Sequence, residues 1–243
     1  MTEPATSPAL ASPHDLAATR RLALVMVGCT AAVLMSMVAT ALATGASQEA
    51  HEHYKLPADY ARDLLARPGG TRLLFALDVA FLVLYTAFFG ALASYLRGLG
   101  QPFTRIAFGA MAVVALLDIV ENHHILSLLS LAEAGRPIDD ASISFQEALS
   151  STKFSISYLS LFLFGLAIPR TTPLSWVLAL FLTVGNLFTG VLGFAAPPAW
   201  RESLDNGRWI GFLLGFGLAF LWLRKAPDRA PVPTTARPRE PND

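Results

Sequence analysis

Residues 103–131, FTRIAFGAMAVVALLDIVENHHILSLLSL, form an apolar stretch with a block of polar residues in its interior. The stretch is long enough to cross a bilayer, for which a helix needs about 20 mostly apolar residues. The polar block consists of Asp118, Glu121, Asn122, His123 and His124. A charged side chain at the bilayer centre costs roughly 2.5–3.5 kcal/mol on insertion scales. Because spanning alone does not require these residues, the block predicts a functional site within the membrane.

Six stretches of the chain are long and apolar enough to be membrane spans. Hydrophobic residues make up 53% of the chain and charged residues 15%, whereas soluble domains average about 25% charged residues. Only helices and closed barrels can cross lipid, and all six stretches are longer than ordinary strands. The sequence therefore predicts an all-α, six-helix transmembrane bundle in one domain, residues 21–225. The predicted spans are residues 22–44, 71–96, 103–131, 150–168, 174–195 and 209–223.

The two ends of the chain differ in composition from this domain. Residues 1–20 and 226–243 are rich in Pro, Ala and Thr, and such segments bury too little apolar surface to fold, so both are predicted to be disordered tails. The first apolar stretch could instead be a secretory signal, since two arginines precede it. A membrane span is favoured, because its apolar run exceeds the roughly 7–15 residues of a signal and Gly28, Ala32 and Ser36 form a small-residue stripe suited to helix packing.

Basic residues indicate the orientation of the chain. If both termini are cytoplasmic, the cytoplasmic side holds the arginines of both tails and of the short loops at residues 97–105 and 170, which are free of acids. The sequence thus predicts a protein of the plasma (inner) membrane with its N-terminus in the cytoplasm. Residues 57–66, in the longest loop, are predicted to form an amphipathic helix on the outer surface. Lys+Arg and Asp+Glu are 18 each, so charge gives no indication of nucleic acid binding.

Helical spacing divides the polar block between two faces. Asp118, Glu121 and Asn122 stand at positions i, i+3 and i+4, so they share one face of the helix. His124 borders that face, whereas His123 points away from it. The first three residues and His124 are therefore predicted to face the interior of the bundle.

The other spans bring polar residues to similar depths. Asp78 and Tyr85 are seven residues apart and share a face of the second span, and the fifth span contributes Asn186. Lys153 and Ser157 lie on a polar stripe of the fourth span, where Lys153 can neutralise Asp78 or Asp118. The sequence predicts that these groups form one pocket in the outer half of the bundle. The predicted substrate-binding residues are Asp78, Tyr85, Asn122, Ser157 and Asn186.

Three classes of function fit such a pocket. The first is an intramembrane site that binds or processes a lipid or another small apolar molecule. In its enzymatic form, Asp118 or Glu121 would act as general acid or base, His124 would shuttle the proton and Lys153 would stabilise negative charge. The sequence leaves open whether the protein is an enzyme.

The second class is a proton-coupled small-molecule transporter, because chains of Asp, Glu and His at membrane depth are typical of proton relays. The third class is a structural or assembly subunit whose polar core only fixes the helix register. Glycines spaced four residues apart, Gly207, Gly211 and Gly215, are typical of close helix packing and predict a homodimer contact. Gly185 and Gly193 suggest a second such face.

No cofactor is indicated by a motif. A metal site is a further alternative, in which the acids and histidines of the polar block would be joined by two histidines of the first long loop. Its ligands would be Asp118, Glu121, His124, His51 and His53. A carboxylate-bridged di-iron site would need a second E-x-x-H pair within the bundle, and the spans contain only the pair formed by Glu121 and His124.

Overall fold

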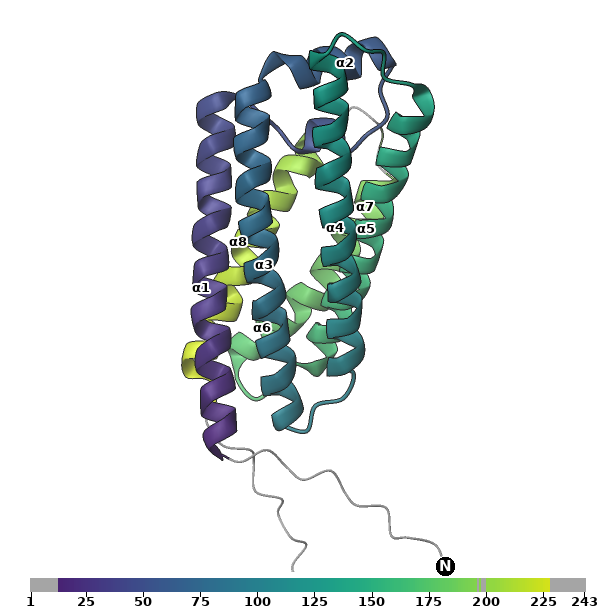
Figure 1. Ribbon diagram of the computed structural model, residues 1–243. Helices are drawn as coiled ribbons and strands as arrows, with labels where there is room; N and C mark the ends of the chain where they lie inside the picture. The colour runs from purple at the N-terminus through teal and green to yellow at the C-terminus, as the bar shows by residue number, and fades with distance from the viewer. Residues whose placement is uncertain (1–12, 196, 198–199, 228–243) are drawn as a thin grey trace, which may run out of the picture.

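The computed structural model of the protein describes residues 13–195, 197 and 200–227. Within these residues the chain forms helices and connecting turns, with no strand. Long helices run side by side along one axis (Figure 1). They are α1 (Pro13–Thr44), α3 (Pro68–Gly98), α4 (Thr104–Glu133), α5 (Asp140–Ala167) and α8 (Arg201–Lys225). A further long helix has three parts: α6 (Pro173–Leu180), the π-helical turn η2 (Phe181–Gly185) and α7 (Asn186–Ala195).

Four helical segments among the described residues are long and apolar enough to cross a membrane, which indicates a membrane-embedded protein. They are Asp15–Thr44, Pro68–Gly98, Asp140–Ala167 and Pro173–Gly193. The two further predicted spans coincide with α4 and α8, which are not among these four.

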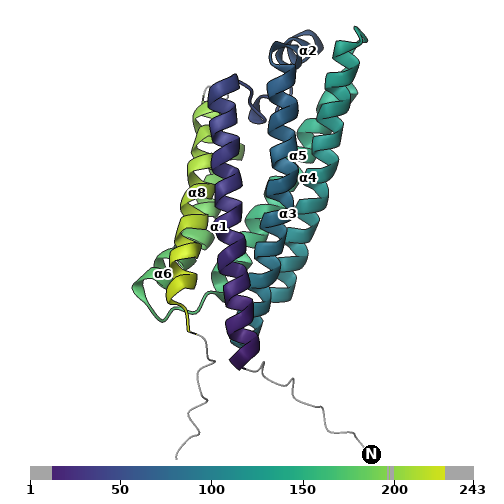
Figure 2. The same ribbon diagram turned by 60° about the vertical axis from the view of Figure 1, so that its left-hand side comes forward.

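The connection between α1 and α3 closes one end of the bundle, here called the α2 end. It contains the short helices η1 (Glu49–His51) and α2 (Pro57–Ala66). The predicted helix at residues 57–66 is confirmed. Proline at its first position fits the fixed φ angle of a helix start, and α2 lies across the ends of the long helices with Tyr60 and Leu64 buried (Figures 1 and 2).

Both described ends of the chain lie at the opposite end of the bundle (Figure 2). Arg20 Nη1 donates a hydrogen bond to the carbonyl of Leu223 at 2.8 Å. Helix α1 begins at Pro13, so residues 13–20 are helical, whereas the sequence predicted a disordered tail there. Leu16 is buried in the core, and Asp15 places negative charge at the positive end of the helix dipole. The remainder of the predicted tails, residues 1–12 and 228–243, lies outside the described residues.

Helix packing places a polar layer between two apolar clusters. One cluster lies under α2 and includes Phe75, Ile125 and Ile143. The other fills the rest of the bundle and includes Leu82 and Leu161. On α3, α4 and α5 alike, the chain passes from one cluster to the other through buried polar residues. The polar residues of the three helices therefore meet at one depth.

Candidate functional site

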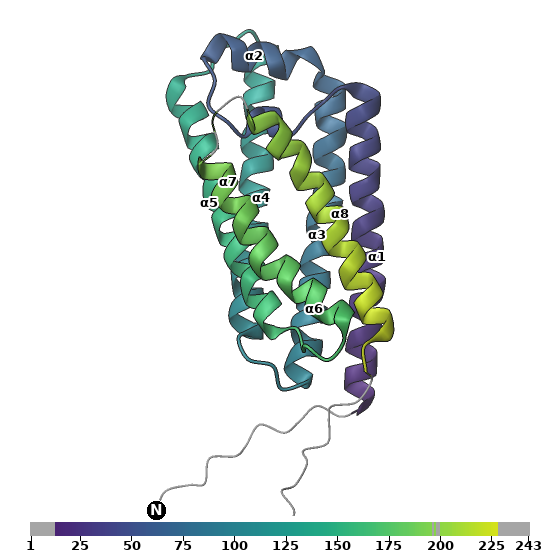
Figure 3. The ribbon, with the colours of Figure 1, turned by 180° about the vertical axis from the view of Figure 1, so that it is seen from behind.

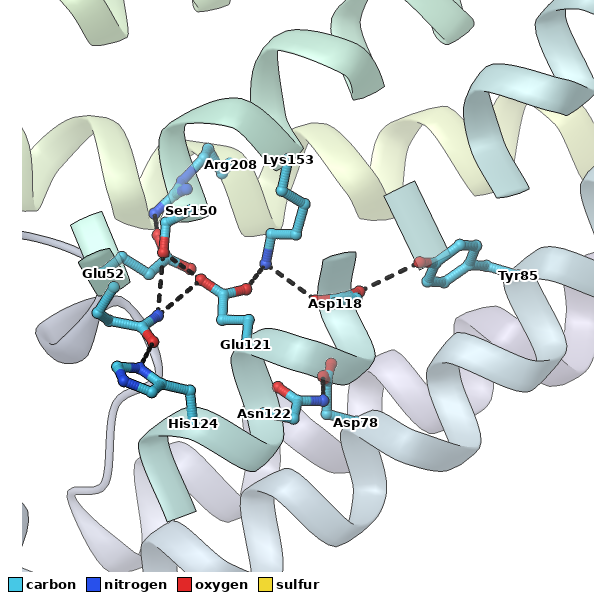
Figure 4. A network of polar contacts seen from close by, with 11 residues as sticks. Glu52, Asp78, Tyr85, Asp118, Glu121, Asn122, His124, Ser150, Lys153 and Arg208 are labelled. Atoms are coloured by element: carbon cyan, nitrogen blue, oxygen red, sulfur yellow. Dashed lines mark hydrogen bonds and ion pairs between the residues drawn. The ribbon is translucent and has the colours of Figure 1, made fainter. Parts of the chain in front are cut away.

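The centre of the polar layer is the ammonium group of Lys153 on α5. Its Nζ lies 2.9 Å from Asp118 Oδ1 and forms a second ion pair with Glu121 Oε2. Both carboxylates come from α4, one helical turn apart, so one cation bridges them (Figure 4). All three residues are buried. In low dielectric, such pairing offsets part of the large cost of removing three charges from water.

Both carboxylate oxygens of Glu121 accept from hydrogen-bond donors on α5. Its Oε1 accepts hydrogen bonds from Gln146 Nε2 at 3.1 Å and from Ser150 Oγ. The Gln146 carbonyl oxygen in turn accepts from His124 Nδ1 at 2.8 Å. A continuous chain of hydrogen bonds and ion pairs thus leads from His124, which is only partly buried, to Lys153 (Figure 4).

Helix α3 supplies the other side of the layer. Tyr85 donates its hydroxyl hydrogen to Asp118 Oδ2 at 3.1 Å. Asn122 Nδ2 donates to Asp78 Oδ2 at 2.6 Å. Asn122 Oδ1 is buried and has no hydrogen-bond partner among the described residues. The Asn122 side chain therefore acts as a hydrogen-bond donor to Asp78. Asp78 forms no ion pair within the described part of the chain.

A second, partly buried ion pair lies toward the α2 end. Arg208 Nη2 on α8 is 2.6 Å from Glu52 Oε2, just after η1. The guanidinium of Arg208 stands 4.3 Å from the centre of the Phe154 ring, and the ammonium of Lys153 stands 4.8 Å from it. Both cations therefore contact the Phe154 ring, which lies beside the two ion-pair systems.

A long cavity runs beside these groups through the bundle. Asp78 and Leu92 both line it from α3, and at 1.5 Å per residue they lie roughly 21 Å apart along the helix axis. About 140 Å³ of the cavity can hold the centres of water-sized molecules, roughly ten times what one enclosed water needs. The cavity is therefore long enough for an extended molecule, and its space exceeds what isolated waters need.

The two halves of this cavity differ in chemistry. Its α2 end is lined by charged and polar side chains: Gln48, Glu49, Glu52, Asp78, Asp118, Lys153 and Arg208. The middle carries Tyr85, Ser157 and Asn186. Aromatic and aliphatic side chains line the other half, including Phe88, Leu92, Ile168, Leu178, Phe216 and Trp222. The cavity is thus amphipathic along its length.

Residues 48–52, which include η1 and lie at the α2 end of the cavity, carry further acids and a histidine. Burial, followed by repulsion from Glu52, raises the pKa of Glu49, although a hydrogen bond from Ser47 opposes this. Burial lowers the pKa of His51 to about 4, with Lys55 contributing in the same direction. His51 is therefore a neutral packing residue at neutral pH, with its ring against Tyr60.

The structure brings most of the predicted site residues together. Those that line the cavity are Asp78, Tyr85, Asp118, Lys153, Ser157 and Asn186. Glu121 is in the network but is fully enclosed, and Asn122 and His124 touch the network from the side away from the cavity. His123 is exposed and donates to the carbonyl of Ile119 at 2.8 Å. Asn186 also donates from Nδ2 to the carbonyl of Phe181 at 3.1 Å, a carbonyl that accepts the backbone N–H of Asn186 as well.

The residues of the alternative metal site are not gathered into one group. Among the described residues, no three His, Cys, Asp or Glu side chains are arranged to hold a metal ion. His51 packs against Tyr60, and His53 lines a separate groove beside Phe154.

Sequence reasoning missed four residues of the site: Gln146, Glu49, Glu52 and Arg208. Glu49 and Glu52 lie in the loop after the first predicted span, and Arg208 directly precedes the last predicted span. Charged residues are common in such loops and span ends, so these three did not stand out. Gln146 stands in a polar part of α5 before the predicted span. Its spacing of four residues from Ser150 was the one available signal that it shares the polar face.

In comparisons with known proteins, no family model, no curated protein and no solved structure matches the chain.

Proposed function

We propose that the protein is an integral membrane protein of six spans that holds an amphipathic lipid in its central cavity. Helices α4 and α8, the third and sixth predicted spans along the chain, would be added to the four apolar segments. Support comes from their lengths, 30 and 25 residues, which at 1.5 Å per residue exceed the roughly 30 Å hydrocarbon core. They also pack along helices that are themselves apolar enough to span.

The orientation follows the basic residues. With both termini in the cytoplasm of a plasma (inner) membrane, the α2 end and the charged half of the cavity lie toward the outer side. The polar head of the ligand would then occupy the outer half of the bundle and its chain would extend toward the cytoplasmic side.

The single observation that carries the proposal is the division of one cavity into a charged half and an apolar half. A lipid has the same division, with a polar head and a hydrocarbon chain. Burial of apolar ligand surface contributes about 25 cal/mol per Å², and the aromatic half offers that surface. Ligand sites of this kind combine mostly apolar walls with a few polar groups that fix the orientation.

The same division disfavours a proton pathway across the membrane. A relay needs groups that exchange protons at successive depths. The charged half provides them, but the described lining of the other half carries no titratable side chain. The transporter alternative therefore has less support from this cavity than lipid binding has.

If the protein also transforms its ligand, Asp118 and Lys153 are the groups of the predicted catalytic set that reach the cavity. Glu121 and His124 do not line it. Glu121 would then act by positioning Lys153, and His124 by connecting the network to the outside of the bundle.

The experiment that tests lipid binding uses Trp222, which lines the apolar half and is 4% exposed. Trp176→Phe, Trp200→Phe and Trp209→Phe are combined so that Trp222 is the single tryptophan, and this purified protein is titrated with hexadecanol brominated at the chain end. Saturable quenching of Trp222 fluorescence is expected. Quenching that only rises in proportion to bromolipid would instead indicate unspecific partition and contradict the proposal.

A pair of variants on α8 provides the matched control. Ala219 lines the cavity and Leu214 is 54% exposed on the outer face. Ala219→Phe fills the chain site and should abolish saturable quenching, whereas Leu214→Phe should preserve it. Equal quenching in the two variants would place the bromolipid outside the cavity.

A further inference from the structure

The charges at the α2 end of the cavity are unequal in number. Four acids line this end, Glu49, Glu52, Asp78 and Asp118, against two bases. Each base is already engaged, since Arg208 pairs with Glu52 and Lys153 pairs with Asp118 and the enclosed Glu121. Within the described residues, Glu49 and Asp78 form no ion pair.

Asp78 is the acid whose surroundings point to a ligand. It is 97% buried, being 3% exposed, yet it lines the cavity and has one described hydrogen bond, from Asn122 to Oδ2. A buried carboxylate without a cation is costly unless a partner compensates its charge. The empty space beside it is where such a partner could sit.

Aromatic rings complete the surroundings of that space. Phe81 and Tyr85 of α3 lie edge to face, with ring centres 5.3 Å apart, and both line the cavity. Trp209 and Phe212 line it from α8. Rings of this kind attract cations to their faces and accept the adjoining methylene groups of an alkyl chain.

We infer that the lipid of the proposed function is a long-chain amine, whose ammonium group lies between Asp78 and Glu49 and whose single chain fills the apolar half of the cavity. This inference rests on the proposed function and adds the charge of the head group. An anionic head, whether carboxylate or phosphate, would meet the unpaired acids and would have to displace an acid from Lys153 or Arg208. The raised pKa of Glu49 fits the same picture, since an ammonium neighbour would counteract the repulsion from Glu52.

The test is a competition among three compounds that share one chain and differ in head charge. The variant that keeps Trp222 as its single tryptophan is first saturated with brominated hexadecanol at pH 8. Hexadecylamine, hexadecanol or hexadecanoate is then added, and recovery of Trp222 fluorescence measures displacement of the probe. At this pH an alkylamine is charged, as a lysine is with its ordinary pKa of about 10.4. We expect hexadecylamine to displace the probe at concentrations about tenfold lower than hexadecanol, and hexadecanoate to be the weakest competitor.

Two variants assign the preference to the acids. Asp78→Asn keeps the shape of the side chain and should bring hexadecylamine to the level of hexadecanol, and Glu49→Gln should reduce the preference in the same direction. Glu133→Gln, on a carboxylate that pairs with Arg72 away from the cavity, should leave the preference unchanged. If Asp78→Asn is poorly folded, Glu49→Gln still decides the outcome.

The possible results separate the inference from the proposed function. Equal displacement by amine and alcohol would overturn the inference and leave lipid binding in place, as would a preference for hexadecanoate. A preference for amine that survives both acid variants would also overturn it. If none of the three displaces the probe, or the probe never saturates, lipid binding itself fails.

Discussion

Lys153 is the residue on which the buried site depends. Among the described residues it is the one cation paired with Asp118 and Glu121, and both carboxylates are buried. A pair of this kind adds little stability over an apolar core, but removal of one partner leaves an uncompensated charge. The energetic role of Lys153 is therefore to compensate the charge of two carboxylates inside the bundle.

We predict that Lys153→Met destabilises the protein strongly. The two carboxylates lose their common cation, which costs about 3–5 kcal/mol and lowers the thermal midpoint by roughly 10 °C for a chain of this size. Thermal unfolding in detergent measures the shift. Lys55→Met is the matched control, because the pair of Lys55 with Asp63 is about a third exposed and such pairs contribute about 0–1 kcal/mol.

Addition of Glu121→Gln to Lys153→Met should recover part of the loss, since one buried charge is then removed. A Lys153→Met protein as stable as the parent would show that the carboxylates are not held by this cation.

The sequence predicts much of this site at the residue scale, because a charge within an apolar run is conspicuous. Asp118, Lys153 and Asp78 stand out for that reason, and the expected pairing of Lys153 with Asp78 or Asp118 is observed with Asp118. The pairing of Glu52 with Arg208 joins residues 156 positions apart in the chain. Helical periodicity gives no information at that separation, so the second ion pair could only come from the fold.

At the scale of the elements, the closest helix packing occurs at a position that spacing in the sequence did not single out. The glycines of α8 were expected to form a packing face. Gly211 and Gly215 line the cavity, and a Cβ atom on Gly215 would lie 3.1 Å from Phe181 Cε1. The tightest approach is at Gly165 on α5. A Cβ atom there would lie 2.7 Å from Thr183 Cγ2, 2.9 Å from Leu182 Cβ and 3.1 Å from the carbonyl oxygen of Ala179. Spacing shows that small residues permit contact, but not which of them are used.

Gly165→Ala should therefore separate α5 from η2. We expect a loss of about 1–3 kcal/mol in unfolding free energy, as for other overpacked contacts, together with weaker binding of the brominated probe because Leu182 also lines the cavity. Gly109→Ala on α4 is the control, since no atom lies within 4 Å of its added Cβ. That change should be neutral or stabilise by about 0.5–1 kcal/mol through helix propensity, and an equal effect of the two substitutions would contradict the assignment of a tight contact to Gly165.

At the scale of the whole molecule, the two described ends of the chain meet at one end of the bundle. Besides the bond between Arg20 and Leu223, Tyr95 donates its hydroxyl hydrogen to the carbonyl of Pro227 at 2.8 Å. Seen from behind, α8 descends from the α2 end to this opposite end beside α1 (Figure 3). A chain that starts and finishes on the same side must cross an even number of times, which six spans satisfy.

The decisive element for this topology is α4, which carries the polar block and connects the loops near residues 101 and 134. If α4 crosses the membrane, those loops lie on opposite sides.

In a Cys29→Ala background, Gln101→Cys and Ala134→Cys are compared for labelling of intact cells by a membrane-impermeant maleimide. We expect labelling of Ala134→Cys alone, with Gln101→Cys labelled only after the cells are opened. Labelling of both in intact cells would mean that α4 does not span, and the reverse pattern would place the charged half of the cavity on the cytoplasmic side. The single cysteine of the chain makes the background a one-residue change, and because Cys29 is exposed on α1 its removal leaves the core packing intact.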